Sequence, residues 1–371
     1  MTSFKRKLYS YYLCLQSLFA RRKKLQTDRI VISKFDGLGD FVLFLDMAKT
    51  IKQMYPKREL VLLCSRLAEP LALQSLIFDK VIVIRKAEEK FLNLRRLKRK
   101  LRSCECDIFL QASVSRDLST ESLTNLIVAN RKITPKFEMV LPDEIILRLS
   151  KRYDEIIDIN MRDMALAQNA SIASYIIGRA VQPNVYRFEN IQNCYLPLPP
   201  KYYVFVLGAS VPWKRFPKDK WKTVARQIYR DTRLPCILIG DRLDEIDTDY
   251  FINGTFECYS LIDKTTILQL ICVISKAQFV IGNDTLAMHI AASCNVKALC
   301  VSLATNGDRF YPYICGEQRP ICIKHNPECQ GCTSHFDTHL MCLDYSQDPP
   351  TARCFNEIDV SEILDKISLL Y

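Results

Sequence analysis

The sequence has no hydrophobic run near its N-terminus that is long enough to cross a membrane. The uncharged stretch Leu8 to Ala20 has 13 residues, whereas a spanning helix needs about 20. No small-residue cleavage site of the signal-peptide type precedes the basic run at residues 21–24. Low-complexity segments and fixed-period repeats are also missing. At 371 residues, 49% of them hydrophobic, the chain is expected to form two globular domains.

Positive charge is concentrated at one end of the chain. Residues 1–102 hold 24 Lys and Arg against 9 Asp and Glu. Such a one-ended excess indicates either an acidic partner, nucleic acid or anionic lipid, or simply a solvated surface. The basic helix predicted over Glu88 to Leu101 has Phe91 as its only aromatic residue and matches no nucleic-acid motif. We therefore expect an anionic membrane surface and no nucleic acid as partner.

The first 27 residues form a basic, amphipathic segment. Tyr11, Leu15 and Phe19 can share one face of a helix with basic residues at both ends. This pattern suits a helix that lies in a membrane interface, and equally a helix that packs on its own domain. We expect a protein of the cytoplasm, peripheral on the inner face of the cytoplasmic membrane.

The sixteen cysteines do not indicate a disulfide scaffold, because the chain is long and most cysteines stand singly in apolar segments. A reducing compartment is the natural reading. Near the C-terminus, a pair with two intervening residues is followed by two further cysteines, which suits a structural zinc site or, alternatively, free thiols or a redox pair. These candidate ligands are Cys329, Cys332, Cys342 and Cys354.

The N-terminal half begins with a strand, a glycine turn and a helix. A β-branched strand at Arg29 to Phe35 runs through residues 36–40 into an apolar helix at Phe41 to Tyr55. This is the first unit of a dinucleotide-type fold, although no third glycine completes GxGxxG. Asp40 then lies at a helix N-terminus, where an N-cap is its simplest role. Strands and helices continue to alternate, which predicts a parallel sheet.

Ligands of such sheets bind beyond the carboxyl ends of the strands. On this side of the first half we place Asp36, Gly39, Asp40, Ser113 and Ser115. The proline-rich stretch at residues 186–200 is the expected linker. The predicted organisation is an N-terminal segment (1–27), a first Rossmann-like domain (28–185), the linker (186–200), a second Rossmann-like domain with the cysteine-rich tail (201–355) and a C-terminal helix (356–371).

The C-terminal half repeats the pattern with cations at its first turn. After a strand at Tyr202 to Leu207, a small-residue turn that includes Ser210 leads to Lys214 and Arg215. Backbone N–H groups and paired cations suit a diphosphate, although solvated surface cations are common. Further on, a strand ends at Gly282.

A small-residue helix follows that second strand end. Asn283 and Asp284 form the turn and Thr285 starts the helix. His289, one helical turn beyond Thr285, lies on the same face, where a structural role is the simpler interpretation. We expect the side chains of Asp284 and Thr285 to face the ligand that binds beyond the carboxyl ends of the strands.

Three motifs in order resemble glycosyltransferase family 9, the lipopolysaccharide heptosyltransferases and their relatives. The first is Gly39-Asp40 after a strand, and the second is the entry to the second domain, residues 207–210 and 214–217. The third reads Gly282-Asn283-Asp284-Thr285-Leu286-Ala287-Met288-His289-Ile290-Ala291-Ala292. In the third, Thr285-Leu286-Ala287 replaces the family's Ser-Gly-Pro, and Gly240-Asp241 stands where many members have Gly-Gly.

The resemblance implies an α/β fold of two Rossmann-like domains facing a cleft, the GT-B type. It implies an inverting glycosyltransferase without a required metal, with Asp40 as general base. On this basis the donor, with ADP-heptose as first candidate, binds Ser210, Lys214, Arg215, Gly282, Asn283, Asp284, Thr285 and His289. The acceptor is a glycolipid or saccharide of the lipopolysaccharide or another surface glycan. The alternatives are a relative that uses another nucleotide-sugar for capsule or other glycans, and a non-catalytic protein that binds nucleic acid or membrane.

Overall fold

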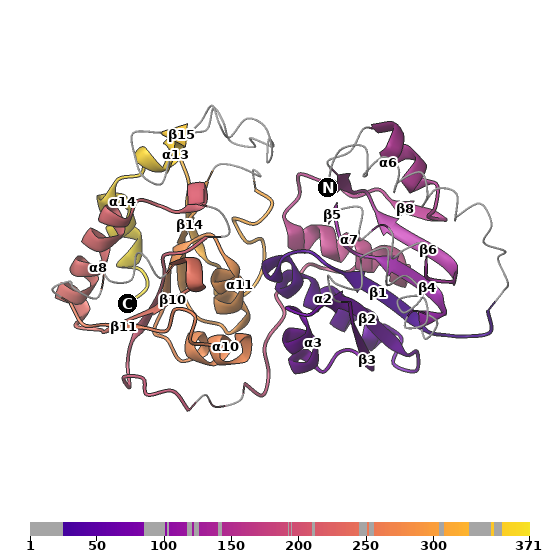
Figure 1. Cartoon of the computed structure of the whole chain (residues 1–371), viewed down its shortest axis with the longest axis horizontal. Helices are drawn as coiled ribbons and strands as arrows, with labels where there is room; N and C mark the ends of the chain where they lie inside the picture. Colours follow the sequence, from indigo (N-terminus) through magenta and orange to yellow (C-terminus); the bar gives the residue numbers. More distant parts are fainter. Residues whose placement is uncertain are drawn as a thin grey trace. The chain divides into compact units, whose positions relative to one another are not determined.

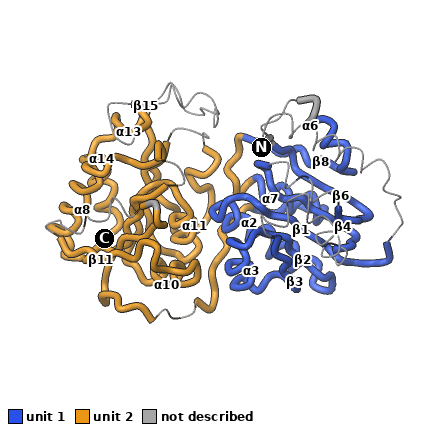
Figure 2. The backbone as a smooth tube through the Cα atoms, viewed as in Figure 1, with its two compact units in different colours: residues 1–161, 168–182 blue, residues 162–167, 183–371 orange. Residues whose placement is uncertain are grey.

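The computed structural model describes residues 25–84, 101, 104–116, 121, 126–139, 143–191, 193, 195–209, 212–244, 251, 256–303, 308–325, 343–344 and 351–371. The predicted N-terminal helix and most of the basic helix at residues 88–101 lie outside these residues. The chain divides into two compact units (Figure 2). Unit 1 comprises residues 1–161 and 168–182, and unit 2 comprises residues 162–167 and 183–371.

Unit 1 is built on a six-stranded parallel sheet in the order β3-β2-β1-β4-β6-β8 (Figure 1). Its strands are β1 (Ile30–Lys34), β2 (Leu60–Ser65), β3 (Lys80–Ile84), β4 (Cys106–Gln111), β6 (Ala129–Pro135) and β8 (Glu155–Ile157). Its helices are α2 (Leu38–Met54), α3 (Glu69–Ser75), α6 (Asp143–Ser150) and α7 (Ala165–Ile177). Two short strands, β5 (Ser115–Arg116) and β7 (Glu138–Met139), pair beyond the main sheet.

Unit 2 repeats this architecture with the order β11-β10-β9-β12-β13-β14, again all parallel. The strands are β9 (Tyr203–Val206), β10 (Cys236–Ile239), β11 (Cys258–Ser260), β12 (Val280–Asn283), β13 (Ala298–Val301) and β14 (Ile321–Ile323). The helices are α8 (Lys218–Thr232), α10 (Ile267–Ser275), α11 (Leu286–Ser293), α13 (Arg353–Asn356) and α14 (Val360–Ile367). Short 3-10 turns, η3 (Pro212–Lys214) and η4 (Arg242–Asp244), follow β9 and β10, and β15 (Leu343–Asp344) pairs antiparallel with β16 (Thr351–Ala352).

Both sheets therefore have the doubly wound order 3-2-1-4-5-6, in which the order of the parallel strands reverses between the first and fourth strands. In unit 1 this switch point lies between β1 and β4, and in unit 2 between β9 and β12. The predicted α/β class with two Rossmann-like domains is confirmed. Ligands of such folds bind at the switch point, beyond the carboxyl ends of the strands.

The central strands are buried because they are continuous apolar runs covered on both faces. Every residue of β1, β9, β10 and β12 is buried. In unit 2, α8 and α14 cover one face and α10 and α11 the other (Figure 1). The predicted C-terminal helix belongs to this core, since Ile363 and Ile367 of α14 are fully buried beside Trp221 of α8.

Two local features differ from what we expected. The helix after the first glycine turn begins at Leu38 rather than Phe41, and its N-cap is Gly37. Asp40 is therefore the third residue of α2 and not its cap. Of the cysteines in the described ranges, ten are free, but Cys272 on α10 is disulfide-bonded, so the scattered cysteines are not all reduced.

Candidate active site

The carboxyl end of β1 carries a buried ion pair. Lys34, the last residue of the strand, contacts the carboxylate of Asp36, and only 5% and 6% of their side chains are exposed. Lys34 Nζ also donates a hydrogen bond to Ala112 O at 3.3 Å and lies 5.7 Å from the centre of the Phe44 ring. The charge of Asp36 is therefore balanced within the loop that follows the strand.

Asp40 lies at the start of α2, directly after the glycine turn. The helix begins with a hydrogen bond from Phe41 N to Gly37 O at 3.0 Å, and Gly39 is the second helical residue. The carboxylate of Asp40 folds back toward Gly37, where an added Cβ would lie 3.6 Å from Oδ2. Asp40 is half-buried, and its negative charge interacts favourably with the helix N-terminus.

The two predicted serines beyond β4 have different environments. Ser113 is fully buried, and its Oγ accepts a hydrogen bond from Phe35 N at 3.1 Å. Gln111 Oε1 accepts hydrogen bonds from Ser33 Oγ at 2.7 Å and from Ser113 N at 3.4 Å. Ser113 therefore joins the loops after β1 and β4, whereas Ser115 on β5 is exposed.

In unit 2, Asn283 joins three segments at the switch point. The side chain is fully buried, and Nδ2 donates hydrogen bonds to Leu207 O at 2.5 Å and to Gly208 O at 3.3 Å. Its Oδ1 accepts from Phe216 N at 3.1 Å and from Trp221 Nε1 at 3.3 Å. With four bonds to the protein, this carboxamide positions the surrounding motifs instead of facing a ligand.

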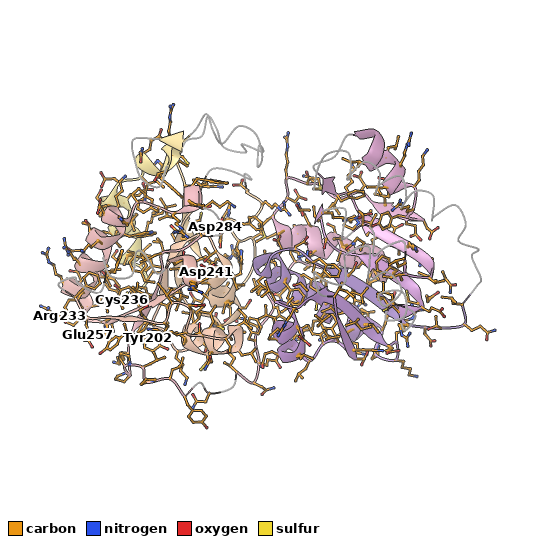
Figure 3. The ribbon with its side chains drawn as sticks, in the orientation of Figure 1. Tyr202, Arg233, Cys236, Asp241, Glu257 and Asp284 are labelled. Carbon is orange, nitrogen blue, oxygen red and sulfur yellow. The ribbon has the colours of Figure 1, made fainter. Side chains whose placement is uncertain are left out.

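The residues after Asn283 lie at the helix start. Asp284 Oδ2 accepts a hydrogen bond from Ser302 Oγ at 3.1 Å. Thr285 is the N-cap of α11, but its side chain makes no capping hydrogen bond, and within the described residues its hydroxyl has no partner. Asp284 and Asp241 lie at one end of the unit 2 strands, with Tyr202 and Cys236 at the other (Figure 3).

The strand that precedes Asn283 needs a glycine. Gly282 has φ +151°, and a Cβ at this position would lie 2.1 Å from Val206 O on the neighbouring strand. Gly282 therefore permits close approach of β9 and β12 at the switch point, which is a backbone role.

The paired cations after β9 are not equivalent. Arg215 Nη2 forms an ion pair with Asp244 Oδ1 at 2.9 Å, and both side chains are largely buried. The Asp244 carboxylate fills the space above Gly208 and Gly240, where an added Cβ would approach it to 2.0 and 2.5 Å. Lys214 is half-buried and has no hydrogen-bond or ion-pair partner among the residues that the structure describes. The cation available to an anionic ligand is therefore Lys214.

His289 is enclosed by aromatic side chains. Its Nδ1 lies 2.6 Å from Tyr313 Oη, and its ring stacks on those of Tyr311 and Tyr313. Burial lowers the pKa of His289 to about 4, although the nearby Asp284 acts in the opposite direction. The structural interpretation thus accounts for His289, which supports α11 from within the core.

Four of the remaining predicted residues lie outside the described ranges. Ser210, Cys329, Cys332 and Cys342 are not among the described residues. Cys354 is buried on α13. Within the described part of the chain, no group of three or more His, Cys, Asp or Glu residues is arranged to hold a metal ion. The zinc site stays a prediction.

The comparison with known families agrees with this geometry. The model of glycosyltransferase family 9 (heptosyltransferase) matches residues 94–339, about two thirds of the chain. The chain belongs to glycosyltransferase family 9. It is therefore a glycosyltransferase, as the motifs predicted. No curated protein sequence matches the chain significantly.

Solved structures of family 9 members are similar in fold. Escherichia coli ADP-heptose lipopolysaccharide heptosyltransferase II is 14% identical, with TM-score 0.69 over 92% of this chain and 98% of that one. The family 9 glycosyltransferase from Veillonella parvula is 14% identical, with TM-score 0.72 over 94% and 99%. The iron-containing dodecameric glycosyltransferase TibC from enterotoxigenic E. coli is 14% identical, with TM-score 0.54 over 94% and 77%. These similarities confirm the GT-B type of fold.

Three residues near the strand ends of this family 9 member were not predicted from the sequence, although the sequence holds a weak indication of each. Lys34 ends a fully buried strand, which is an unusual place for a lysine unless it is paired. Asp244 is one of several acidic residues in its segment, so the sequence did not single it out. Two glycines at neighbouring strand ends, Gly208 and Gly240, did indicate that another group packs closely against the backbone there. Arg116, described below, follows a serine-rich turn that looked exposed. In the described ranges, no helix combines the length and apolar character that a membrane crossing requires.

Proposed function

We propose that the chain is an inverting, metal-independent glycosyltransferase that transfers heptose from ADP-heptose to a lipopolysaccharide-type or other surface-glycan acceptor. The observation that carries the proposal is the division of chemistry between the two switch points. The switch point of unit 1 offers a half-buried carboxylate, Asp40, and that of unit 2 offers Lys214 beside the N-terminus of α11. A base for the acceptor and a site for a diphosphate are what inverting transfer requires.

In the proposed reaction, Asp40 takes the proton of the acceptor hydroxyl as that oxygen attacks the anomeric carbon of the donor. The new C–O bond forms on the face opposite the bond to the diphosphate, which breaks and inverts the configuration. Asp36 is a poorer candidate for the base because it is committed to the ion pair with Lys34. Asp40 lies outside the residues matched by the family model, so its role rests on position and environment.

The leaving nucleoside diphosphate carries the negative charge that develops in the transition state. Lys214 and the backbone N–H groups at the start of α11 are the groups proposed to stabilise it. The hydrogen bond from Phe216 N to Asn283 Oδ1 brings the segment of Lys214 to the end of β12. Positive charge from the chain itself fills the role that a metal ion has in other transferases.

ADP-heptose is the first candidate donor because it is named for the similar E. coli enzyme. The alternative is another nucleotide-sugar, favoured by Thr285-Leu286-Ala287 in place of Ser-Gly-Pro at the helix start. The test is a panel of nucleotide-sugars, with thermal shift for binding and product analysis with heptose-deficient lipopolysaccharide. A ligand at 100 times its Kd adds about 2.7 kcal/mol of stability. A thermal shift and sugar transfer with another nucleotide-sugar, but not with ADP-heptose, would favour the alternative donor.

An anionic membrane at the cytoplasmic face is the proposed place of action. The basic excess of residues 1–102 supports it, since each Lys or Arg near such a surface contributes about 1 kcal/mol. Full-length protein should sediment with anionic vesicles, less so at high salt. Replacing the basic residues among positions 5–7 and 21–24 by glutamine should weaken sedimentation. Equal binding of both proteins would exclude the N-terminal segment as the anchor.

The cysteine-rich tail is proposed to hold a structural metal ion that takes no part in transfer. Four thiolates suit zinc, and sulfur ligands also suit iron, the metal of the similar TibC structure. Metal analysis of the purified chain after mild chelation should find about one ion per molecule and identify it. Metal-free protein with unchanged stability would contradict the proposal.

A further inference from the structure

Arg116 lies in a buried polar cluster beyond the carboxyl end of β4. Its Nη1 donates hydrogen bonds to Glu121 Oε1 at 2.8 Å and to Tyr153 Oη at 3.0 Å. Neither the Arg116 nor the Glu121 side chain is exposed to solvent. The guanidinium also lies 4.2 Å from the centre of the Phe137 ring. Among the described residues, the cluster is thus an ion pair that is closed to solvent.

The other donors of Arg116 hold the main chain of the loop after β4. Nε donates to Ser113 O at 2.6 Å, and Nη2 donates to Gln111 O at 3.3 Å and to the hydroxyl of Thr134. A planar guanidinium presents five N–H donors in a rigid fork and so holds several oxygens in one fixed geometry, whereas a lysine ammonium presents three donors on a flexible stem. The path of residues 111–116 is therefore fixed by one side chain.

This loop in turn holds the segment that leads to Asp40. Ser113 Oγ accepts the hydrogen bond of Phe35 N at 3.1 Å, and Ala112 O accepts that of Lys34 Nζ at 3.3 Å. Lys34 is paired with Asp36. A continuous series of hydrogen bonds therefore runs from Glu121 and Arg116 to the turn that precedes α2.

Stability alone does not explain such a cluster. Removing two charges from water costs more than their attraction often returns, and apolar replacements of a whole buried pair are frequently as stable as the pair. A buried ion pair is better explained where it fixes one conformation. Here the fixed conformation is that of the loops at the switch point of unit 1.

We propose that Arg116 is a positioning residue for transfer: through Ser113 and Ala112 it fixes the turn that carries Asp36 and aims Asp40. This inference rests on the proposed role of Asp40 as base. Arg116 itself contacts neither substrate.

The test replaces the whole cluster, so that no charge is left buried alone. The variant Arg116→Met with Glu121→Leu and Tyr153→Phe is compared with Arg131→Met with Glu155→Leu and Tyr175→Phe. The second cluster has the same three residue types in the same unit, but the Arg131 side chain is 50% exposed and its bonds do not reach the turn. Arg116→Lys is a second, milder variant, which keeps the positive charge but lacks the planar guanidinium and its several fixed N–H donors.

Two measurements decide the outcome. Hydrogen exchange of the Phe35 amide should become about 10-fold faster or more in the Arg116 variants and stay unchanged in the control. In the Arg116 variants, the kcat for transfer from ADP-heptose to heptose-deficient lipopolysaccharide should fall by about 10- to 100-fold, because a small misplacement of a reacting group has effects of this size. The donor Kd should not change.

Unchanged exchange, or an unchanged kcat per folded molecule, would overturn the inference, as would equal effects in the control. The exchange measurement needs no substrate, so it is decisive whatever the donor is. Full activity of Asp40→Asn would instead contradict the proposed function, and a normal Phe35 amide in the Arg116 variants would contradict this inference alone.

Discussion

The carboxamide oxygen of Asn283 accepts a hydrogen bond from the indole N–H of Trp221, 62 residues earlier in the chain, at 3.3 Å. The same oxygen accepts from Phe216 N, and the amide group donates to the turn after β9. One buried side chain thus joins the strand end that carries Asp284, the segment that carries Lys214 and the first helix of unit 2. Each of the two motifs of the second domain therefore supplies half of this junction.

The first prediction concerns this junction. Asn283→Asp keeps the shape of the side chain but replaces an amide donor by a carboxylate oxygen that faces Leu207 O and Gly208 O. An unpaired buried charge should lower the free energy of unfolding by about 2–4 kcal/mol. Thermal and denaturant unfolding measure the loss. Asn295→Asp, an exposed position in the same unit, is the control and should change stability little. Equal stability of both variants would contradict the role given to Asn283.

The second prediction separates the two cations after β9. Lys214→Met should raise the Kd for the nucleotide-sugar by about 10-fold or more, as loss of a charged hydrogen bond implies, and leave the melting temperature unchanged. Arg215→Met should instead lower the free energy of unfolding by about 2–3 kcal/mol, because Asp244 loses its partner while largely buried. Calorimetric titration and thermal unfolding distinguish the two. Lys201→Met, at an exposed position, serves as control, and a donor Kd unaffected by Lys214→Met would remove Lys214 from the site.

Alternating strands and helices predicted the architecture well, because short continuous apolar runs such as Tyr203–Val206, when they alternate with helices, are typical of buried parallel strands. The glycine turns and their order in the chain predicted which ends of the strands carry the motifs. Contacts between distant residues could not be predicted in this way. Nothing in the pattern indicated that Arg215 pairs with Asp244, that Asn283 bonds to Trp221, or that Ser113 supports the turn of Asp36, because each depends on three-dimensional distance between segments that are separate in sequence.

The third prediction concerns pH. Burial holds the pKa of His289 at about 4 in the folded chain, whereas an unfolded histidine titrates near 6.5. The unfolded state therefore binds the extra proton between pH 6.5 and 4, so stability falls as the pH is lowered through this window. The contribution lost is about 3 kcal/mol. In His289→Gln the free energy of unfolding should depend less on pH in this window. His325→Gln, at a partly exposed histidine, is the control. A pH dependence identical to wild type would show that His289 is not buried as the neutral form.

The last prediction concerns the base. Asp40 and Asp36 lie four residues apart in one turn, but their environments differ. Asp36 is paired with Lys34 and almost excluded from solvent, whereas Asp40 is half-buried in the first turn of α2. Loss of a general base typically costs 10²- to 10⁴-fold in rate. Asp40→Asn should therefore lower kcat by about this factor and leave the nucleotide-sugar Kd unchanged, since the donor is proposed to bind unit 2.

Asp36→Asn is the matched comparison for that variant. It leaves Lys34 buried without its carboxylate, so it should lower the melting temperature, and its kcat should fall less than that of Asp40→Asn. Steady-state kinetics, donor titration and thermal unfolding of both variants give the pattern. If Asp36→Asn abolishes turnover while Asp40→Asn keeps it near normal, the base is Asp36 and the ion pair with Lys34 must open during the reaction. If neither substitution affects kcat, the turn before α2 does not supply the base, and the acceptor proton must leave through a group elsewhere in the chain.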